Sequence, residues 1–188
     1  MKTRQVLFAL VVLLAAHGSA RSDFIATATL TGDGEAPNSP GVGAGTVTFD
    51  AATDSLAVAL AFANLSSPTQ PVDTMGAAHI HFGEPDVEGP VLFPFTDFPT
   101  GVTYGGFSTV LTAADFMPDP ADGIDTFAEA VNAIEGGHTY FNIHTVDYPG
   151  GEIRGQITTV PEPATLTLAA LGLGGVLVFA ACKRRLAA

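Results

Sequence analysis

The stretch "LAVALAFANL", residues 56–65, decides the fold class. Its large apolar side chains occupy every second position: Leu56, Val58, Leu60 and Phe62. Because successive side chains of a strand point to opposite faces, this period of two predicts a strand with one buried face. Strands of this kind are typical of antiparallel sheets that are covered on one side.

The same alternation recurs on both sides of this stretch. Short runs, separated by Gly, Pro, Asp and Asn, are "FIATATLTG" (24–32), "GTVTFD" (45–50), "AHIHF" (78–82), "VLFPF" (91–95), "YFNIHT" (140–145) and "EIRGQITT" (152–159). Several short strands with turn residues between them predict an all-β fold, a single β-sandwich or barrel.

One segment has a helical period instead. In "DTFAEAVNAIE", residues 125–135, apolar side chains recur at helical spacing: Phe127, Val131 and Ile134. Thr126 and Glu129 form a capping-box pattern, and Gly136 suits the position just past the last turn. We therefore expect one short helix over about 125–135, followed by a strand over about 138–145.

Strand parity gathers polar side chains on one outward face. In "AHIHF" the apolar side chains point one way and both histidines point the other. The runs "YFNIHT" and "EIRGQI" divide in the same manner. If these strands belong to one sheet, its outer face carries a polar cluster: His79, His81, Asn142, His144, Glu152, Arg154 and Gln156.

Two interpretations of this cluster stay open. A His-x-His pair with a third histidine from another strand suits copper or zinc, and the candidate ligands are then His79, His81 and His144. By parity, His138 is a candidate for a fourth nitrogen. In the other interpretation the cluster is a hydrogen-bonded polar face, where Glu152 or another acid pairs with Arg154 and the histidines bond loop backbone. Such a face would serve as the contact surface of the domain.

Catalytic patterns do not emerge from the sequence. We find no Ser or Cys nucleophile motif and no evident pair of carboxylates, so no catalytic residue is assigned and a non-enzymatic protein is expected. The acidic run "DPADGID" (119–125) lacks the alternate spacing and terminal Glu of an EF-hand calcium loop. We expect it to form a turn that leads into the helix.

The N-terminus has the form of a secretory signal peptide. Lys2 and Arg4 precede the apolar run "VLFALVVLLAA", and the small-residue end "HGSA" suggests cleavage after Ala20. Residues 1–20 are therefore expected to direct export.

The C-terminus has the form of a membrane anchor. Residues 164–182 carry no charge, and a helix of that length spans roughly 28 Å, close to the thickness of a bilayer core. A basic tail follows at once: Lys183, Arg184 and Arg185. Since basic clusters stay on the cytoplasmic side, the sequence predicts a transmembrane helix with the body of the protein outside the cytoplasm.

The body between these ends is strongly acidic. Residues 21–160 contain two arginines, no lysine and 18 acidic residues, and the whole chain has a formal net charge of −12. Such a body argues against nucleic-acid partners, whose phosphates require Lys and Arg. It also has no cysteine, so its stability has to come from its core and not from disulfides.

The last 29 or so residues resemble a known sorting signal. Pro161, Glu162 and Pro163, followed by the apolar span and the basic tail, are similar to the PEP-CTERM signal. The resemblance implies recognition by an exosortase, a membrane transpeptidase of Gram-negative-type bacteria that make extracellular polysaccharide. The prolines hold the chain extended and remove backbone donors, which suits a segment that such an enzyme binds. The implied location is membrane-anchored at first, then the cell surface or extracellular matrix.

Two longer blocks resemble the CHRD domain, which is named from chordin. They are "AAHIHFGEPDVEGPVLFPF" (77–95) and "GHTYFNIHTVDYPGGEIRGQI" (137–157), and with upstream stretches the resemblance covers about residues 24–158. It implies a single immunoglobulin-like, Greek-key β-sandwich without an established catalytic activity. The expected organisation is a signal peptide at 1–20, a CHRD domain at 21–159 and a sorting signal at 160–188.

The expected function is that of a non-enzymatic exported module of the cell envelope or extracellular matrix. Its expected partners are an exosortase-type transpeptidase and extracellular polysaccharide or other matrix material. The alternative is a metal-binding domain, because the His-x-His strand is similar in geometry to that of copper/zinc superoxide dismutase. The chain departs from that enzyme in having no disulfide pair, no evident bridging histidine and no ligand set for a second metal.

Overall fold

The computed structural model describes residues 22–161. Its elements are β1 (Phe24–Thr31), β2 (Val42–Asp50), β3 (Ser55–Ala63), β4 (Ala78–Phe82), β5 (Val91–Pro94), β6 (Gly105–Leu111), α2 (Phe127–Glu135), β7 (Thr139–Ile143), β8 (Ile153–Gln156) and β9 (Thr158–Thr159). The expected signal peptide, the apolar span 164–182 and the basic tail lie outside these residues. Within the described part, no helix is both long and apolar enough to cross a membrane.

All nine strands belong to one antiparallel sheet. The order is β5-β4-β7-β8-β1-β2-β3-β6, and β9 pairs with β1. Strand β8 joins β1 through the pair Thr31–Arg154, and β9 continues along β1 from there. The half made of β5, β4, β7 and β8 is thus hydrogen-bonded to the half made of β1, β2, β3 and β6.

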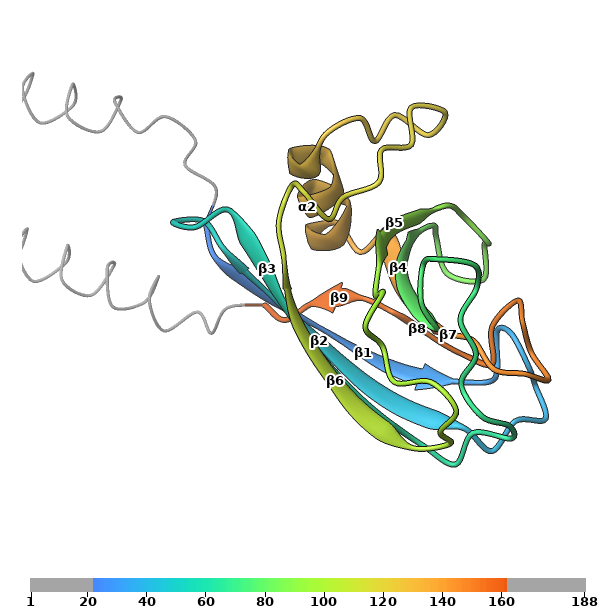
Figure 1. Ribbon diagram of the computed structural model, residues 1–188. Helices are drawn as coiled ribbons and strands as arrows, with labels where there is room; N and C mark the ends of the chain where they lie inside the picture. The colour runs from blue at the N-terminus through green and yellow to red at the C-terminus, as the bar shows by residue number, and fades with distance from the viewer. Residues whose placement is uncertain (1–21, 162–188) are drawn as a thin grey trace, which may run out of the picture.

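The sheet bends so that its two halves face each other around one core (Figure 1). At the free edges, Phe95 just after β5 packs on Phe107 of β6 with ring centroids 5.1 Å apart. The fold is therefore a nearly closed barrel or sandwich built from a single sheet. The prediction of a mainly β fold with one short helix is confirmed, and the immunoglobulin-like connectivity stays a prediction.

The apolar residues whose alternation predicted β3 fill the core. Leu56, Val58, Leu60 and Phe62 are all buried, and the alanines between them are exposed. Across the core the two halves approach closely at Gly45 of β2, where an added Cβ would lie 2.5 Å from the ring of Phe141 on β7. Only glycine fits beneath this ring, since no real Cβ makes so short a contact.

Helix α2 covers one end of the sheet and contacts both halves. It packs on β1 and β9, and Phe127 meets Phe93 of β5 edge to face at 6.0 Å between centroids. The predicted capping box is present, because Thr126 accepts from the Glu129 N–H and the Glu129 carboxylate accepts from the Thr126 N–H. Gly136 ends the helix with an ordinary φ, and the left-handed residue is Gly137, one position later.

The acidic run 119–125 forms a turn, as expected. Asp119 pairs with Ile124 through backbone hydrogen bonds in both directions. The carboxyl groups of Asp119 and Asp122 interact, and this hydrogen bond raises the pKa of Asp122. The turn leads directly into the cap of α2.

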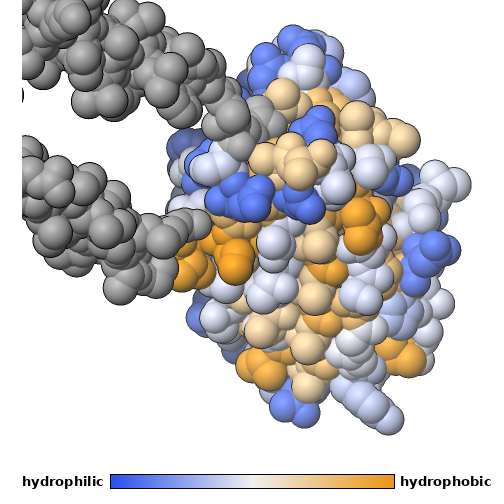
Figure 2. Space-filling view, turned by 90° about the vertical axis from the view of Figure 1, so that its left-hand side faces the viewer, coloured by the Kyte–Doolittle hydropathy of each residue, from blue (hydrophilic) through white to orange (hydrophobic). Residues whose placement is uncertain are grey.

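Between its ends, the outward face of the first half is bare and carries no ionisable group; Asp50 lies at its edge, at the last position of β2. We call this the uncharged face, and its exposed residues lie in register across β1, β2, β3 and β6: Ile25, Thr27, Thr29, Ala44, Thr46, Thr48, Ala57, Ala59, Ala61, Gly106, Ser108 and Val110. Figure 2 shows pale and light-orange residues across the middle of this view, with hydrophilic residues mainly around its border.

Candidate functional site

The polar cluster expected from strand parity lies on the outward face of β4, β7 and β8. Register pairs His79 with Asn142, and Asn142 with Arg154, in one row across the three strands. The next row joins His81, Tyr140 and Gln156. Together with His144 and Glu152, which directly follow β7 and precede β8, these side chains form what we call the covered face.

Loops bury this face, so the expectation of a free contact surface is wrong. His79, Asn142, His144, Glu152 and Arg154 are each at most 6% exposed, and His81 is 9% exposed. The loop after β4 and the loop after β7 lie over these side chains, and their backbone carbonyls accept hydrogen bonds from most of them. A surface that the strand pattern places outward is therefore inside the folded domain.

Glu152 and Arg154 do not pair with each other. The Glu152 carboxylate accepts hydrogen bonds from the Ser39 hydroxyl, the Ser66 N–H and the Thr145 hydroxyl, at 2.6, 2.6 and 2.7 Å. Burial opposes its ionisation, but these donors outweigh burial and lower its pKa. A buried carboxylate with three donors needs no cation.

Arg154 is held by a different acid and by an aromatic ring. Its guanidinium lies 3.7 Å from the carboxylate of Glu35, donates to the Glu84 carbonyl at 2.7 Å and stands 3.4 Å over the ring of Tyr140. The ring of Tyr140 also stacks on that of His81, with centroids 4.9 Å apart and planes 12° apart. Sequence reasoning missed Glu35 and Tyr140, although Tyr140 shares the parity of Asn142 and could have been assigned by it.

Asn142 and Gln156 bond loop backbone only. Asn142 donates to the Gly150 carbonyl at 3.1 Å, and Gln156 donates to the carbonyls of Gly83 and Gly137 at 2.9 and 2.8 Å. The amide nitrogens of these two residues therefore hold backbone around the cluster, while their oxygens, Oδ1 of Asn142 and Oε1 of Gln156, are buried without a hydrogen-bond partner.

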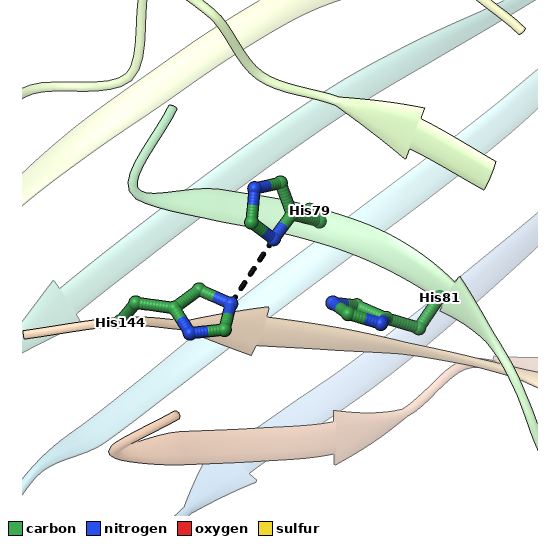
Figure 3. Close-up of side chains that lie close together, drawn as sticks. All are labelled: His79, His81 and His144. Carbon is green, nitrogen blue, oxygen red and sulfur yellow. Dashed lines mark hydrogen bonds between the residues drawn. The ribbon is translucent and has the colours of Figure 1, made fainter. Parts of the chain in front are cut away.

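The three histidines His79, His81 and His144 converge into one group. One ring nitrogen from each lies within 4.8 Å of one from each of the others. Nδ1 of His79 and Nε2 of His144 are 3.0 Å apart, and in Figure 3 the ring of His81 extends toward this pair. We call these three residues the histidine trio.

Hydrogen bonds to backbone fix the tautomers of two rings in the trio. Nδ1 of His144 donates to the Pro149 carbonyl at 3.0 Å, and Nδ1 of His81 donates to the Gly89 carbonyl at 2.9 Å, because a carbonyl can only accept. Both Nε2 atoms are then unprotonated. His144 uses its Nε2 to accept from Nδ1 of His79, so that ring also has a bare Nε2.

Two nitrogens of the trio are buried with no partner at hydrogen-bond geometry, namely Nε2 of His79 and Nε2 of His81, although the backbone of Met75 and Gly76 lies close enough to the His79 ring to act on its pKa. An unpaired buried acceptor costs free energy, and such atoms are rare in native proteins. Imidazoles that donate Nδ1–H to backbone and present a bare Nε2 are arranged as metal-binding histidines usually are.

All three imidazoles are held in the neutral form. Burial lowers the pKa of His79 to about 3 and that of His81 to about 4, and it also lowers the pKa of His144. His144 and His81 lower the pKa of His79 further, and His144 and Arg154 lower that of His81 further. Neutral imidazole is the form that ligates metals, so the trio needs no proton loss to the solvent before binding.

His138 is not part of this site. Its Nδ1 lies 2.6 Å from the carboxylate of Glu84, and both side chains are exposed. The expectation of a fourth nitrogen from His138 is therefore wrong. Of the sorting residues, Pro161 is described and exposed, and Glu162 and Pro163 lie outside the described residues.

Comparison with known families supports both resemblances. A family model described as the CHRD domain matches residues 26–157, and one described as the PEP-CTERM protein-sorting motif matches residues 159–185. Searches of curated proteins and of solved structures gave no significant match. Neither family is an enzyme family, and the sorting motif implies export and exosortase-type sorting in Gram-negative bacteria. The chain therefore belongs to the CHRD domain family and carries a PEP-CTERM sorting motif.

Proposed function

We propose that this protein is a non-enzymatic module of the cell envelope or extracellular matrix, delivered by exosortase-type sorting. The observation that carries the proposal is the sorting motif at 159–185, directly after a CHRD domain at 26–157. In this proposal residues 1–20 direct export, 21–159 form the functional domain, and 160–188 anchor the chain in the membrane until processing.

Sorting is tested by fractionating cells that have or lack the transpeptidase. The expected result is that the chain leaves the membrane fraction only when the enzyme is present. A variant with Glu162→Ala and Pro163→Ala should stay in the membrane fraction in both strains, while the matched control Pro118→Ala, in a loop of the domain, should behave as the wild type. Release of the motif variant at the wild-type rate would contradict the proposal.

The uncharged face is the surface we assign to matrix contact. It offers hydroxyl and methyl groups in regular rows, for example Thr27, Thr46, Ala59 and Ser108. The rest of the domain is strongly acidic, so an anionic polymer would be repelled at long range. A neutral polysaccharide, which also presents hydroxyl and apolar C–H groups, meets no such penalty.

A matched pair of alanine-to-glutamate variants tests this surface in the full chain, purified in detergent. Ala59→Glu places a charge in the middle of the uncharged face, and Ala113→Glu places the same charge on an exposed turn away from it. Co-sedimentation with an insoluble neutral polysaccharide should drop at least about tenfold for Ala59→Glu, a loss of roughly 1.4 kcal/mol. Equal binding by both variants would remove the assignment of this face.

Metal binding is the second candidate function, and the histidine trio is the observation that favours it. Two of its buried nitrogens have no partner, and a transition metal held by the trio would bind one of them directly, Nε2 of His81. The test is metal content by mass spectrometry of the full chain, purified without a histidine tag after exposure to copper or zinc. About one metal per chain, lost in His79→Ala, is the expected result, and no retained metal in the wild type would exclude this function.

A further inference from the structure

The electrostatics of the histidine trio bear on which metal it would take. All three candidate donors are neutral imidazoles, and within residues 22–161 no carboxylate, thiolate or fourth histidine joins the group. The trio is buried, so the charge of a bound ion would not be screened by water. A bound ion would therefore keep its full charge inside the domain.

No carboxylate of the described residues contacts the trio to offset it. The charged group that acts on His81 is the guanidinium of Arg154, on the other side of the Tyr140 ring, and it disfavours a further positive charge there, although Glu35 pairs with it. The carboxylate of Glu152 lies on the same face, but it bonds Ser39, Ser66 and Thr145 and none of the three imidazoles. Burying an uncompensated ion is costly, and in a continuum description the cost rises with the square of its charge. A monovalent ion is favoured over a divalent one.

The number of available ligands also favours copper(I) over zinc(II). Zinc in proteins almost always has four ligands, with water or substrate in the fourth position when the protein supplies three. The trio supplies three nitrogens beneath covering loops, and His138, the residue that could have added a fourth, pairs with Glu84 instead. Copper(I) is monovalent and is stable with three ligands; sulfur ligands are its usual preference, and imidazole is among the ligands that suit copper.

The geometry needs only small adjustments to bind one ion. Metal–nitrogen bonds of roughly 2.0–2.1 Å place two ligand nitrogens of one three-coordinate ion about 3.5–3.6 Å apart. Nδ1 of His79 and Nε2 of His144 are 3.0 Å apart, close to that spacing. The widest gap in the trio, 4.8 Å, has to shorten by roughly 1–1.5 Å to match it, and rotation of the His81 ring is the simplest way.

We propose that the histidine trio is a three-coordinate copper(I) site, with His79 ligating through Nδ1 and His81 and His144 through Nε2. This inference rests on the metal-binding function proposed above. When copper binds, His79 exchanges the proton on Nδ1 for one on Nε2 and stays neutral. The backbone of Met75 and Gly76 already interacts with this ring, and we expect it to accept from the new Nε2–H. The atom that has no partner in the metal-free protein thereby becomes a donor.

The first experiment compares two metals on the full chain in detergent, without a histidine tag and without oxygen. Copper(I) and zinc(II) are each offered in competition with a chromophoric chelator. We expect one copper(I) per chain and an affinity for copper(I) at least about 100-fold above that for zinc(II). Zinc bound as tightly as copper(I) would overturn the copper(I) assignment and leave the metal-binding function standing. If neither metal binds, the metal-binding function fails as well.

X-ray absorption on the copper-loaded wild type tests the ligands without relying on a variant that has to fold. Three nitrogen neighbours at roughly 2.0 Å are expected, and two or four would contradict the assignment. The variants His81→Ala and His138→Ala then form a matched pair, each checked for folding by circular dichroism. Copper(I) affinity should fall at least about tenfold in the first and stay unchanged in the second.

Discussion

The two outward faces of the sheet start from the same strand alternation and end in opposite states. The uncharged face over β1, β2, β3 and β6 is bare, with small neutral side chains in water. The covered face over β4, β7 and β8 holds histidines, a carboxylate and a guanidinium, nearly all of them buried. The strands are equally regular on both, so the difference lies in what the loops do.

The direction in which the loops run explains this difference. Strands β2 and β3 are joined by only four residues, 51–54. The longer β1–β2 connection, 32–41, crosses to the other half, where Glu35 reaches Arg154 and Ser39 reaches Glu152. The connections 83–90 and 144–152 supply the carbonyls that bind His81, His144 and Arg154. An outward strand position is therefore a surface position only where no loop folds over it.

The largest expected effect tests what the two halves share, namely one core. Phe141→Ala removes a fully buried ring that packs over Gly45, and it should lower the free energy of unfolding by about 3–5 kcal/mol. Chemical denaturation measures the loss, with exposed Val110→Ala as the control within about 0.5 kcal/mol of the wild type. A loss below about 1 kcal/mol would mean that the halves do not pack on a common core.

The second-largest effect concerns Glu152, which binds segments around the covered face through three hydrogen bonds. Glu152→Ala leaves the donors of Ser39, Ser66 and Thr145 without their acceptor, and it should cost about 1.5–3 kcal/mol. Because the pKa of Glu152 is lowered from its usual value near 4.5, the stabilisation is present above that pH and is lost as the pH falls below it. Chemical denaturation at pH 7 and pH 3.5 should therefore show a smaller difference in the free energy of unfolding between wild type and variant at the lower pH.

A third effect distinguishes the faces by their response to acid. In metal-free protein the unfolded chain protonates His79 below about pH 6.5, whereas the folded chain does so only near pH 3. The free energy of unfolding should therefore decrease as the pH is lowered through this interval, and it should decrease less steeply in His79→Ala. Urea midpoints at pH 7.5 and pH 5 measure the slope, with exposed Thr74→Ala as a control. An unchanged slope in His79→Ala would show that this ring is not held neutral by burial.

The smallest effect is expected on the bare side. Thr46→Ala lies on the uncharged face without a buried contact, and it should change the free energy of unfolding by less than about 0.5 kcal/mol. Asn142→Ala, on the covered face, loses the bond to the Gly150 carbonyl and should cost about 1 kcal/mol. Equal losses in the two variants would abolish the distinction between the faces.

Most of the strands and the helix could be predicted, because both follow from local periodicity. Leu56 to Phe62 repeat with a period of two, and Thr126 with Glu129 marks the start of α2. Parity also placed His79, His81 and His144 on one face. It could not show that the sheet is continuous through the pair Thr31–Arg154, because long-range pairing leaves no local pattern.

The burial of the cluster could not be predicted for a similar reason. Glu35 reaches Arg154 from a loop that is distant in sequence, and the carbonyls of Gly89 and Pro149 carry no side-chain signal at all. Backbone acceptors are the same at every position, so the sequence does not reveal which of them will meet a given imidazole. The partners of the trio became visible only with the loops in place.

The short strand β9 has a mechanical consequence for the proposed form of the chain that is anchored through residues 160–188. Only Thr158, Thr159 and the Val160 N–H bind it to β1, and Ile157 just before it is fully buried. A pull applied at residue 161 loads this short ladder before it loads the core. When β9 separates from β1, the four residues 158–161 form an extended linker of roughly 13 Å. In this anchored form, the segment after Ile157 would extend first, and small displacements of the anchoring surface would not strain the core of the domain.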